Sequence, residues 1–150
     1  MSWYEAFAFC VWDGGYLPTE ETNYASAGGA EQRAFPWSSP PGAATIDCSY
    51  VNGTSCTSGP DRVGSQSPNG DSKWGQADLS GNVWEWTLDY FASTYPKPCT
   101  DCAELAAQSY RTAHGGYYFN AALQLRGAFR GFTDPTLHSP DTGVRCARIP

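Results

Sequence analysis

The chain has 150 residues, a mass of 16.2 kDa and a formal net charge of −6, from nine basic and fifteen acidic residues. This length suits a single domain over residues 1–150, and the acidic balance excludes nucleic acid and anionic membranes as primary partners. No apolar run is long enough for a membrane span, and the residues after Met1 lack the charged and apolar regions of a signal peptide.

Two helices are predicted near the N-terminus. Ser2 and Glu5 have the spacing of a capping box ahead of an apolar stretch, which predicts a first helix over about residues 3–12. Thr19 precedes two glutamates that complement a helix dipole, and the glycine pair at 28–29 predicts where that second, shorter helix ends.

The middle of the chain, residues 33–75, is rich in Pro, Gly, Ser, Asp and Asn and shows little periodicity. This composition predicts a long loop region rather than helices or strands. After it, four segments have the aromatic, β-branched or alternating character of short strands, mostly antiparallel. The fold class is therefore α+β with little regular secondary structure, and the four predicted strands cover residues 84–91, 110–119, 123–130 and 143–149.

Six cysteines are present, at positions 10, 48, 56, 99, 102 and 146, with only two histidines. In a short acidic chain this balance favours disulfide bonds over a zinc site. Disulfide bonds in turn indicate an oxidising compartment, periplasmic or secreted.

Three stretches of the chain match motifs that occur together in one family. They are Trp3–Cys10 running into Leu17–Glu20, then Gly81–Trp86, then Gly143–Arg148. Together they resemble the formylglycine-generating enzyme, or sulfatase-modifying factor, family over nearly the whole chain. The resemblance implies an irregular fold related to the C-type lectin fold, with this chain corresponding to the C-terminal part of the family domain.

The resemblance also bears on copper. Family members that oxidise a sulfatase cysteine to formylglycine hold copper with two cysteines five residues apart, shortly after a Gly-Gly turn. Counted from Gly115 and Gly116, the corresponding positions here are Asn120 and Leu125. Because Cu(I) needs soft thiolate ligands, we expect no copper site and no formylglycine-generating activity.

A calcium motif is better retained. By resemblance, Asp78 and Glu85 match carboxylate ligands, and Gly81 and Val83 match residues that offer backbone carbonyls. Mixed carboxylate and carbonyl oxygens are what Ca²⁺ prefers. The alternative is that Asp78 and Glu85 only cap turns between buried tryptophans. We expect Ca²⁺ as a cofactor with a structural role.

The same resemblance implies a disulfide between Cys10 and Cys146. The other four cysteines are then expected to pair locally, Cys48 with Cys56 and Cys99 with Cys102. A redox dithiol is the alternative for the last pair, but no thioredoxin-like βαβ pattern surrounds it.

Four residues, Tyr117, Tyr118, Phe119 and Asn120, replace those that line the active-site groove of the family. Tyrosine and asparagine suit adaptable recognition of a small-molecule or peptide ligand, and core packing is the alternative use of the aromatic rings. The resemblance extends to lectin-fold variable proteins, in which this C-terminal region is diversified for binding.

Three functions remain open. The first is a calcium-binding module without oxidase activity, whose ligand contacts the groove residues and Gln124, Arg126, Arg130 and Phe132. The second is a Ca²⁺-assisted hydrolase of esters, phosphoesters or phosphotriesters. The third is a fragment of a longer sulfatase-modifying protein, in which a homodimer covers the exposed edge. Candidate catalytic residues for the hydrolase are His138, Asp134, Asp141, Arg126, Arg130 and Arg145.

Overall fold

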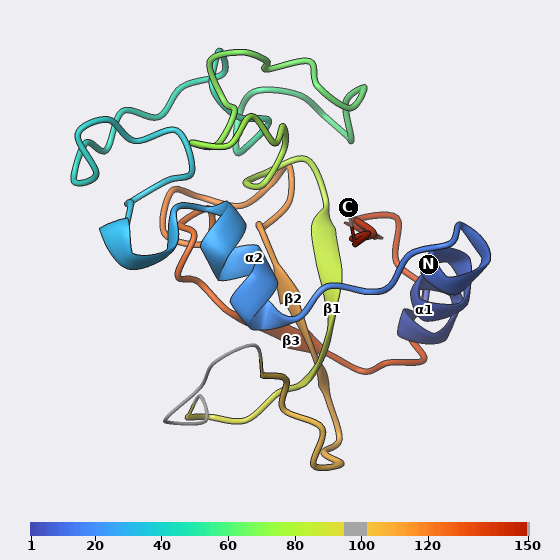
Figure 1. Ribbon diagram of the computed structural model, residues 1–150. Helices are drawn as coiled ribbons and strands as arrows, with labels where there is room; N and C mark the ends of the chain where they lie inside the picture. Colours follow the sequence, from blue (N-terminus) through green and yellow to red (C-terminus); the bar gives the residue numbers. More distant parts are fainter. Residues whose placement is uncertain (95–101, 150) are drawn as a thin grey trace.

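The computed structural model describes residues 1–94 and 102–149 and has the α+β architecture expected from the sequence (Figure 1). Two helices, α1 and α2, contact strand β1, and α2 also contacts β2. The helices and strands are α1 (Trp3–Trp12), α2 (Glu20–Ser26), the short 3₁₀ helix η1 (Gly29–Glu31), β1 (Trp84–Tyr90), β2 (Arg111–His114), β3 (Gly131–Thr133) and β4 (Thr142–Gly143).

Both helices begin where their capping residues predict. The Ser2 hydroxyl accepts a hydrogen bond from the Glu5 amide at 3.3 Å, and Glu5 Oε2 accepts one from the Ser2 amide at 2.8 Å. Thr19 caps α2 in the same way, because its hydroxyl accepts a hydrogen bond from the Thr22 amide at 3.1 Å. These side chains satisfy amides that the first turn of a helix otherwise leaves unpaired.

The four strands form one sheet in the order β3-β2-β1-β4. Neighbours pair antiparallel except β1 and β4, which run parallel, so the prediction of mostly antiparallel pairing holds with one exception. After β3, at one edge of the sheet, the chain crosses to the opposite edge, where β4 lies parallel to β1. No helix among the described residues is long and apolar enough to cross a membrane.

Of the predicted strand boundaries, only those of β1 agree with the structure. The strand predicted over 110–119 ends at His114, because Gly115 and Gly116 have positive φ angles of 91° and 74°. The strand predicted over 143–149 is reduced to β4 and a single bridge between Tyr16 and Ala147.

The strand predicted over 123–130 is wrong, because the segment forms successive turns in which only Leu125 is buried. Its apolar pattern therefore does not mark one face of a strand. The third sheet strand is β3, which follows directly after it.

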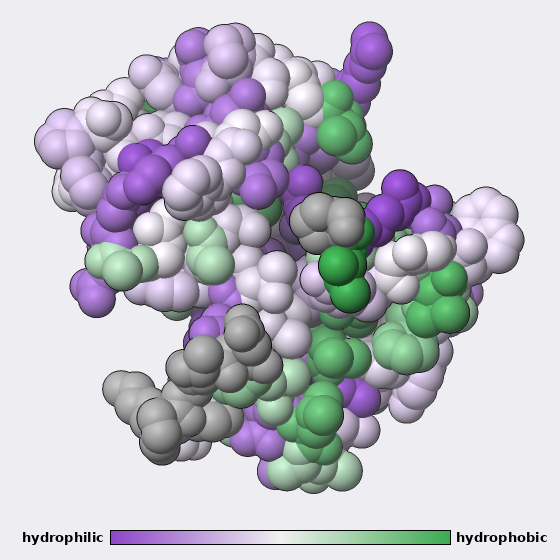
Figure 2. Space-filling view, in the orientation of Figure 1, coloured by the Kyte–Doolittle hydropathy of each residue, from purple (hydrophilic) through white to green (hydrophobic). Residues whose placement is uncertain are grey.

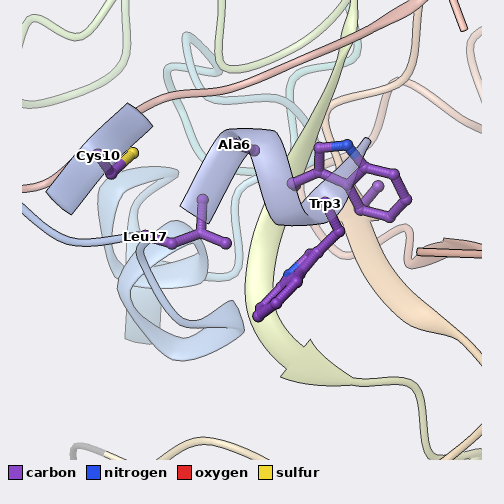
Figure 3. Packing of buried hydrophobic residues seen from close by; sticks show 6 residues of the cluster. Trp3, Ala6, Cys10 and Leu17 are labelled. Atoms are coloured by element: carbon purple, nitrogen blue, oxygen red, sulfur yellow. The ribbon is translucent and has the colours of Figure 1, made fainter. Parts of the chain in front are cut away.

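The main hydrophobic core lies between α1 and the sheet (Figure 3). One face of α1 enters this core, and the Trp3 indole Nε1 donates a hydrogen bond to the Thr87 carbonyl on β1 at 2.7 Å. The buried members of the core are Trp3, Ala6, Cys10, Leu17, Trp86 and Ala113. A second, smaller core consists of Phe35, Val51 and Leu125.

The outer face of α1 carries apolar side chains in solvent. Phe9, Val11 and Trp12 are 43%, 56% and 80% exposed. In Figure 2 hydrophobic residues gather on this side of the molecule, whereas the surface of the long irregular segment is mainly hydrophilic or neutral.

Two disulfide bonds hold the irregular parts of the chain. Cys10 on α1 is joined to Cys146 beyond β4, a sequence separation of 136 residues, and Cys48 is joined to Cys56. Both bonds are consistent with an oxidising compartment. Residues 33–75, all of which the structure describes, contain no helix or strand, as the composition predicts. The predicted bond between Cys99 and Cys102 involves Cys99, which lies outside the described residues.

Candidate functional site

The four residues that match calcium ligands line one cavity of about 140 Å³. They lie in the segment that enters β1, and Glu85 is the second residue of that strand. The turn before the strand requires positive φ angles at Asp78, Gly81 and Asn82, of 56°, 79° and 65°. A Cβ atom at Gly81 would lie 2.5 Å from the Asn52 carbonyl oxygen, so only glycine fits there.

The carboxylate of Glu85 is held by Arg145. Arg145 donates two hydrogen bonds, from Nε to Oε2 at 2.9 Å and from Nη2 to Oε1 at 2.6 Å, and Nη2 also donates to the Ala77 carbonyl at 2.8 Å. Burial raises the pKa of Glu85, the Arg145 guanidinium opposes that rise, and the negative charge of Asp78 adds to it. Two carboxylates and one guanidinium therefore share this cavity.

The oxygen atoms of the cavity fit a hard cation. Asp78 Oδ2 accepts a hydrogen bond from the Gly64 amide at 2.6 Å, and the carbonyls of Gly81 and Val83 accept none from the described residues. Carboxylate and carbonyl oxygens are the ligand types that Ca²⁺ prefers, and an ion here would share the two Glu85 oxygens with Arg145, which donates to both. Across the described ranges, no three His, Cys, Asp or Glu side chains are grouped to hold a metal, so a cation here depends on these carbonyls.

At the positions of the family's copper-binding cysteines, the structure places residues with structural roles. Leu125 is 1% exposed and belongs to the second core. Its methyl groups lie against Gly53 and Gly116, where a Cβ atom would approach them to 2.8 Å and 2.9 Å. The Asn120 side chain closes a turn, because its Oδ1 accepts a hydrogen bond from the Tyr117 amide at 3.0 Å.

Tyr117, Tyr118 and Phe119 form what we call the aromatic turn. Their rings contact one another, with centroids 5.3 Å apart for Tyr117 and Tyr118 and 4.6 Å apart for Tyr118 and Phe119. Phe119 is 54% exposed and the two tyrosines are half-buried. The groove residues thus form a partly exposed aromatic surface, supported by Asn120, rather than the centre of a core.

The aromatic turn is bonded to two other parts of the molecule. Thr54, inside the loop closed by the Cys48–Cys56 bridge, donates from its amide to the Asn120 carbonyl at 3.1 Å and from its hydroxyl to the Phe119 carbonyl at 2.6 Å. The Tyr118 amide donates to the Asn82 carbonyl at 3.1 Å, inside the calcium motif. The position of the aromatic turn therefore depends on the loop that carries the candidate cation ligands.

Three of the other residues expected to contact a ligand, Arg126, Arg130 and Phe132, contact other parts of the molecule. Arg130 forms an ion pair with Glu20, and Phe132 lines a cavity of about 210 Å³ with Trp84. Arg126 lines a third cavity, and Gln124 Oε1 is buried without a partner among the described residues. The structure thus divides the predicted C-terminal contact region into separate sites.

The candidate catalytic residues of a hydrolase are also dispersed. His138 pairs with Glu5 at 2.9 Å on the surface, and Asp134 accepts hydrogen bonds from Thr136. Asp141 lines the cavity beside Trp84. Of the cationic candidates, Arg145 alone lines the Asp78–Glu85 cavity.

Sequence reasoning missed a buried cluster around Glu20. Glu20 is 3% exposed and accepts two hydrogen bonds from Arg130, at 2.6 Å and 2.7 Å, and one from Thr112 at 2.8 Å. His114 Nε2 lies 3.3 Å from its carboxylate. Burial opposes ionisation, but the hydrogen bonds from His114 and Arg130 outweigh it and lower the pKa of Glu20 to about 2. The only sequence signal was an acidic residue in the first turn of a helix.

The whole chain, residues 1–150, matches the family described as sulfatase-modifying factor enzyme 1-like domain, and the chain belongs to this family. This confirms the resemblance seen in its motifs.

Among curated relatives, the chain is 33% identical to the formylglycine-generating enzyme of Streptomyces coelicolor, over 98% of this chain and 51% of that protein. It is 32% identical to the inactive C-alpha-formylglycine-generating enzyme 2 of Mus musculus, over 98% of this chain and 47% of that protein. The chain thus spans about half the length of these relatives. Among solved structures, Treponema denticola variable protein 1 superposes with a TM-score of 0.72 at 26% identity, over 89% of this chain and 47% of that one.

Proposed function

We propose that this chain is a calcium-stabilised ligand-binding module of the sulfatase-modifying factor family, and that it does not oxidise cysteine to formylglycine. The observation that carries the proposal is Leu125, which fills the second core where the family's oxidases need a copper-binding thiolate. An aliphatic side chain offers no donor to Cu(I), and the amide of Asn120 is a poor substitute for the first thiolate.

Family membership alone does not decide between an oxidase and a binding module, since the relatives include proteins named as active and as inactive enzymes. The residues at positions 120 and 125 favour the inactive group. The likeness to a protein named as a variable protein adds support for a binding role.

The contact surface of the module is the aromatic turn. Tyrosine and phenylalanine offer a large contact area while losing little conformational entropy on binding, and Tyr117 and Tyr118 add hydroxyl groups for hydrogen bonds. The turn is held in place on both sides, by Thr54 and by Asn82. A surface prepared in this way suits a small molecule or a short peptide.

Calcium has a supporting role in this proposal. Asp78, Glu85 and the carbonyls of Gly81 and Val83 would hold the ion, which supplies charge neutralisation and fixed loop geometry rather than redox chemistry. The Gly81 amide donates a hydrogen bond to the Gly115 carbonyl at 2.7 Å, just before the aromatic turn. An ion that fixes the calcium loop would therefore also fix the position of the aromatic turn.

The test has two parts. The first incubates the purified protein with a cysteine-containing sulfatase peptide, oxygen and Cu(I), and follows aldehyde formation by mass spectrometry. We expect none, and conversion of the peptide would overturn the first half of the proposal.

The second part pans short random peptides displayed on phage against the calcium-loaded protein. Enriched peptides should bind the native protein, bind more weakly in EGTA, and lose affinity for the variant Phe119→Ser. Phe132→Ser is the matched control, because Phe132 is exposed to a similar extent, 53%, but lies outside the aromatic turn. If the peptides bind the native protein and the Phe119→Ser variant equally well, the aromatic turn is not the contact surface.

A further inference from the structure

A cavity of about 350 Å³ lies where the end of α2 and helix η1 meet the segment 126–128. Two backbones approach closely here, since a Cβ atom on Gly127 would lie 3.2 Å from the Cβ atom of Ala27. Small residues form part of its lining, including Ala34 and Ala128. Its volume is in the lower range of sites for small ligands.

The walls of this cavity are polar and cationic. Tyr24, Gln32, Arg33 and Arg126 line it. Gln32 is held in the left-handed region, with φ 49°, at the end of η1. A few polar side chains beside small apolar ones can orient a ligand within a cavity.

The Arg33 side chain is held in position, but not all of its hydrogen-bond donors are used. Its Nε donates to Glu31 Oε2 at 2.7 Å, and Nη1 lies 3.3 Å from the Pro36 carbonyl. Its aliphatic stem packs on Gly28, where a Cβ atom would lie 2.7 Å from the Arg33 Cδ. Neither polar contact uses Nη2, which remains available as a donor.

Arg126 is exposed, and no ion pair or side-chain hydrogen bond joins it to the described residues. Glu31, which lines the neighbouring hollow, is already shared between Arg33 and Lys73. This cavity and the shallow hollow beside it, around Trp74, are lined by three cations and one carboxylate, a local charge of +2 in a chain of net charge −6.

We propose that this cavity binds a small organic anion through a carboxylate or phosphate group. Arg126 and the free Nη2 of Arg33 donate to the oxygens of the anion, since guanidinium groups match planar and tetrahedral oxyanions. Tyr24, which is 37% exposed, packs against the organic part. The site goes beyond the proposed function, because it includes no residue of the aromatic turn or of the calcium loop.

Isothermal titration calorimetry at fixed ionic strength tests this with three probes: phenyl phosphate, benzoate and inorganic phosphate. Saturable binding of one stoichiometric site is expected, and comparing the first two probes shows whether phosphate or carboxylate is the preferred group. Arg126→Gln should weaken the preferred probe about tenfold, the usual effect of losing a charge-assisted hydrogen bond. Tyr24→Leu should weaken phenyl phosphate and benzoate but leave inorganic phosphate unchanged.

Arg62→Gln is the matched control, because Arg62 is also an exposed arginine but does not line the cavity. Both arginine variants should melt at the temperature of the native protein. The proposal is overturned if none of the probes binds saturably, or if Arg62→Gln weakens binding as much as Arg126→Gln, which would indicate general attraction of anions to positive charge.

Discussion

Arg145 and Glu85 are 60 residues apart in sequence and form a two-point ion pair that joins β1 to the segment after β4. Glu85 is buried, and Arg145 supplies the positive charge that compensates it within the described structure. The pair connects the calcium motif to the segment that carries Cys146, so two regions recognised separately as sequence motifs form one site.

In calcium-free protein, replacing Arg145 by methionine should therefore leave Glu85 buried and uncompensated. Breaking a buried pair costs about 3 to 5 kcal/mol, and because the Arg145 side chain is 30% exposed we expect about 2 to 3 kcal/mol less unfolding free energy in urea. Arg148→Met is the control. Its pair with Asp13 is on the surface, so the loss there should stay below about 1 kcal/mol. Equal losses in both variants would show that Glu85 does not depend on Arg145.

Calcium should raise the melting temperature of metal-free protein. A ligand at about one hundred times its Kd adds about 2.7 kcal/mol of stability. Asp78→Asn should abolish this response, whereas Asp71→Asn, which changes a carboxylate outside the cavity, should retain it. Differential scanning calorimetry across a calcium titration measures both. A response of the same size in Asp78→Asn would place any bound calcium elsewhere.

Stability should fall in acid through Glu20. Its pKa is lowered to about 2 in the folded protein from an ordinary value of 4.5. The stabilisation is therefore fully present above about pH 4.5 and is lost as the pH falls toward 2. The shift corresponds to about 3 kcal/mol at neutral pH.

Urea unfolding of native protein and Glu20→Gln between pH 2 and 7 measures this contribution. The two stability curves should converge as the pH falls toward 2 and separate above 4.5. Asp61→Asn, outside the Glu20 cluster, should follow the native curve. Parallel curves for Glu20→Gln and native protein would show that Glu20 contributes nothing to the acid dependence.

The two disulfides should contribute unequally to the unfolding free energy. In the chain-entropy description, closing the loop of 136 residues between Cys10 and Cys146 gives about 5 kcal/mol, and closing the loop of 8 residues between Cys48 and Cys56 gives about 2.5 kcal/mol. Double replacement by alanine, one bridge at a time, measures the difference in unfolding free energy. If removing the Cys48–Cys56 bridge lowers the unfolding free energy more than removing the Cys10–Cys146 bridge, packing around the sulfurs rather than loop entropy determines the contribution of each disulfide.

Local features of the fold were predictable from sequence. The capping side chains of Ser2 and Thr19 act within their own first turn, so both helix starts could be read directly. The strand error over 123–130 has a different origin. The apolar residues there predict a strand face, but Leu125 packs against Gly53 and Val51, which come from a distant part of the chain.

In the candidate site, too, the features formed by residues close in sequence were predictable and those formed by distant residues were not. Asp78, Gly81, Val83 and Glu85 lie within eight residues, so their shared cavity follows from a local motif. The partners of Glu20 could not be predicted, because they lie on β2 and beside β3, about ninety to one hundred and ten residues away. The anion cavity could not be predicted because its lining residues come from two segments about ninety residues apart, 24–34 and 126–128.

The bond between Cys10 and Cys146 also determines how the protein would respond to a protease. The irregular segment 33–75 is exposed at Arg62, a site for trypsin, and no disulfide among the described residues crosses that position except this one. A chain cut there remains one covalent molecule on a non-reducing gel and separates into two fragments only after reduction. Cleavage of the irregular segment would thus leave α1 joined to the end of the sheet that it covers.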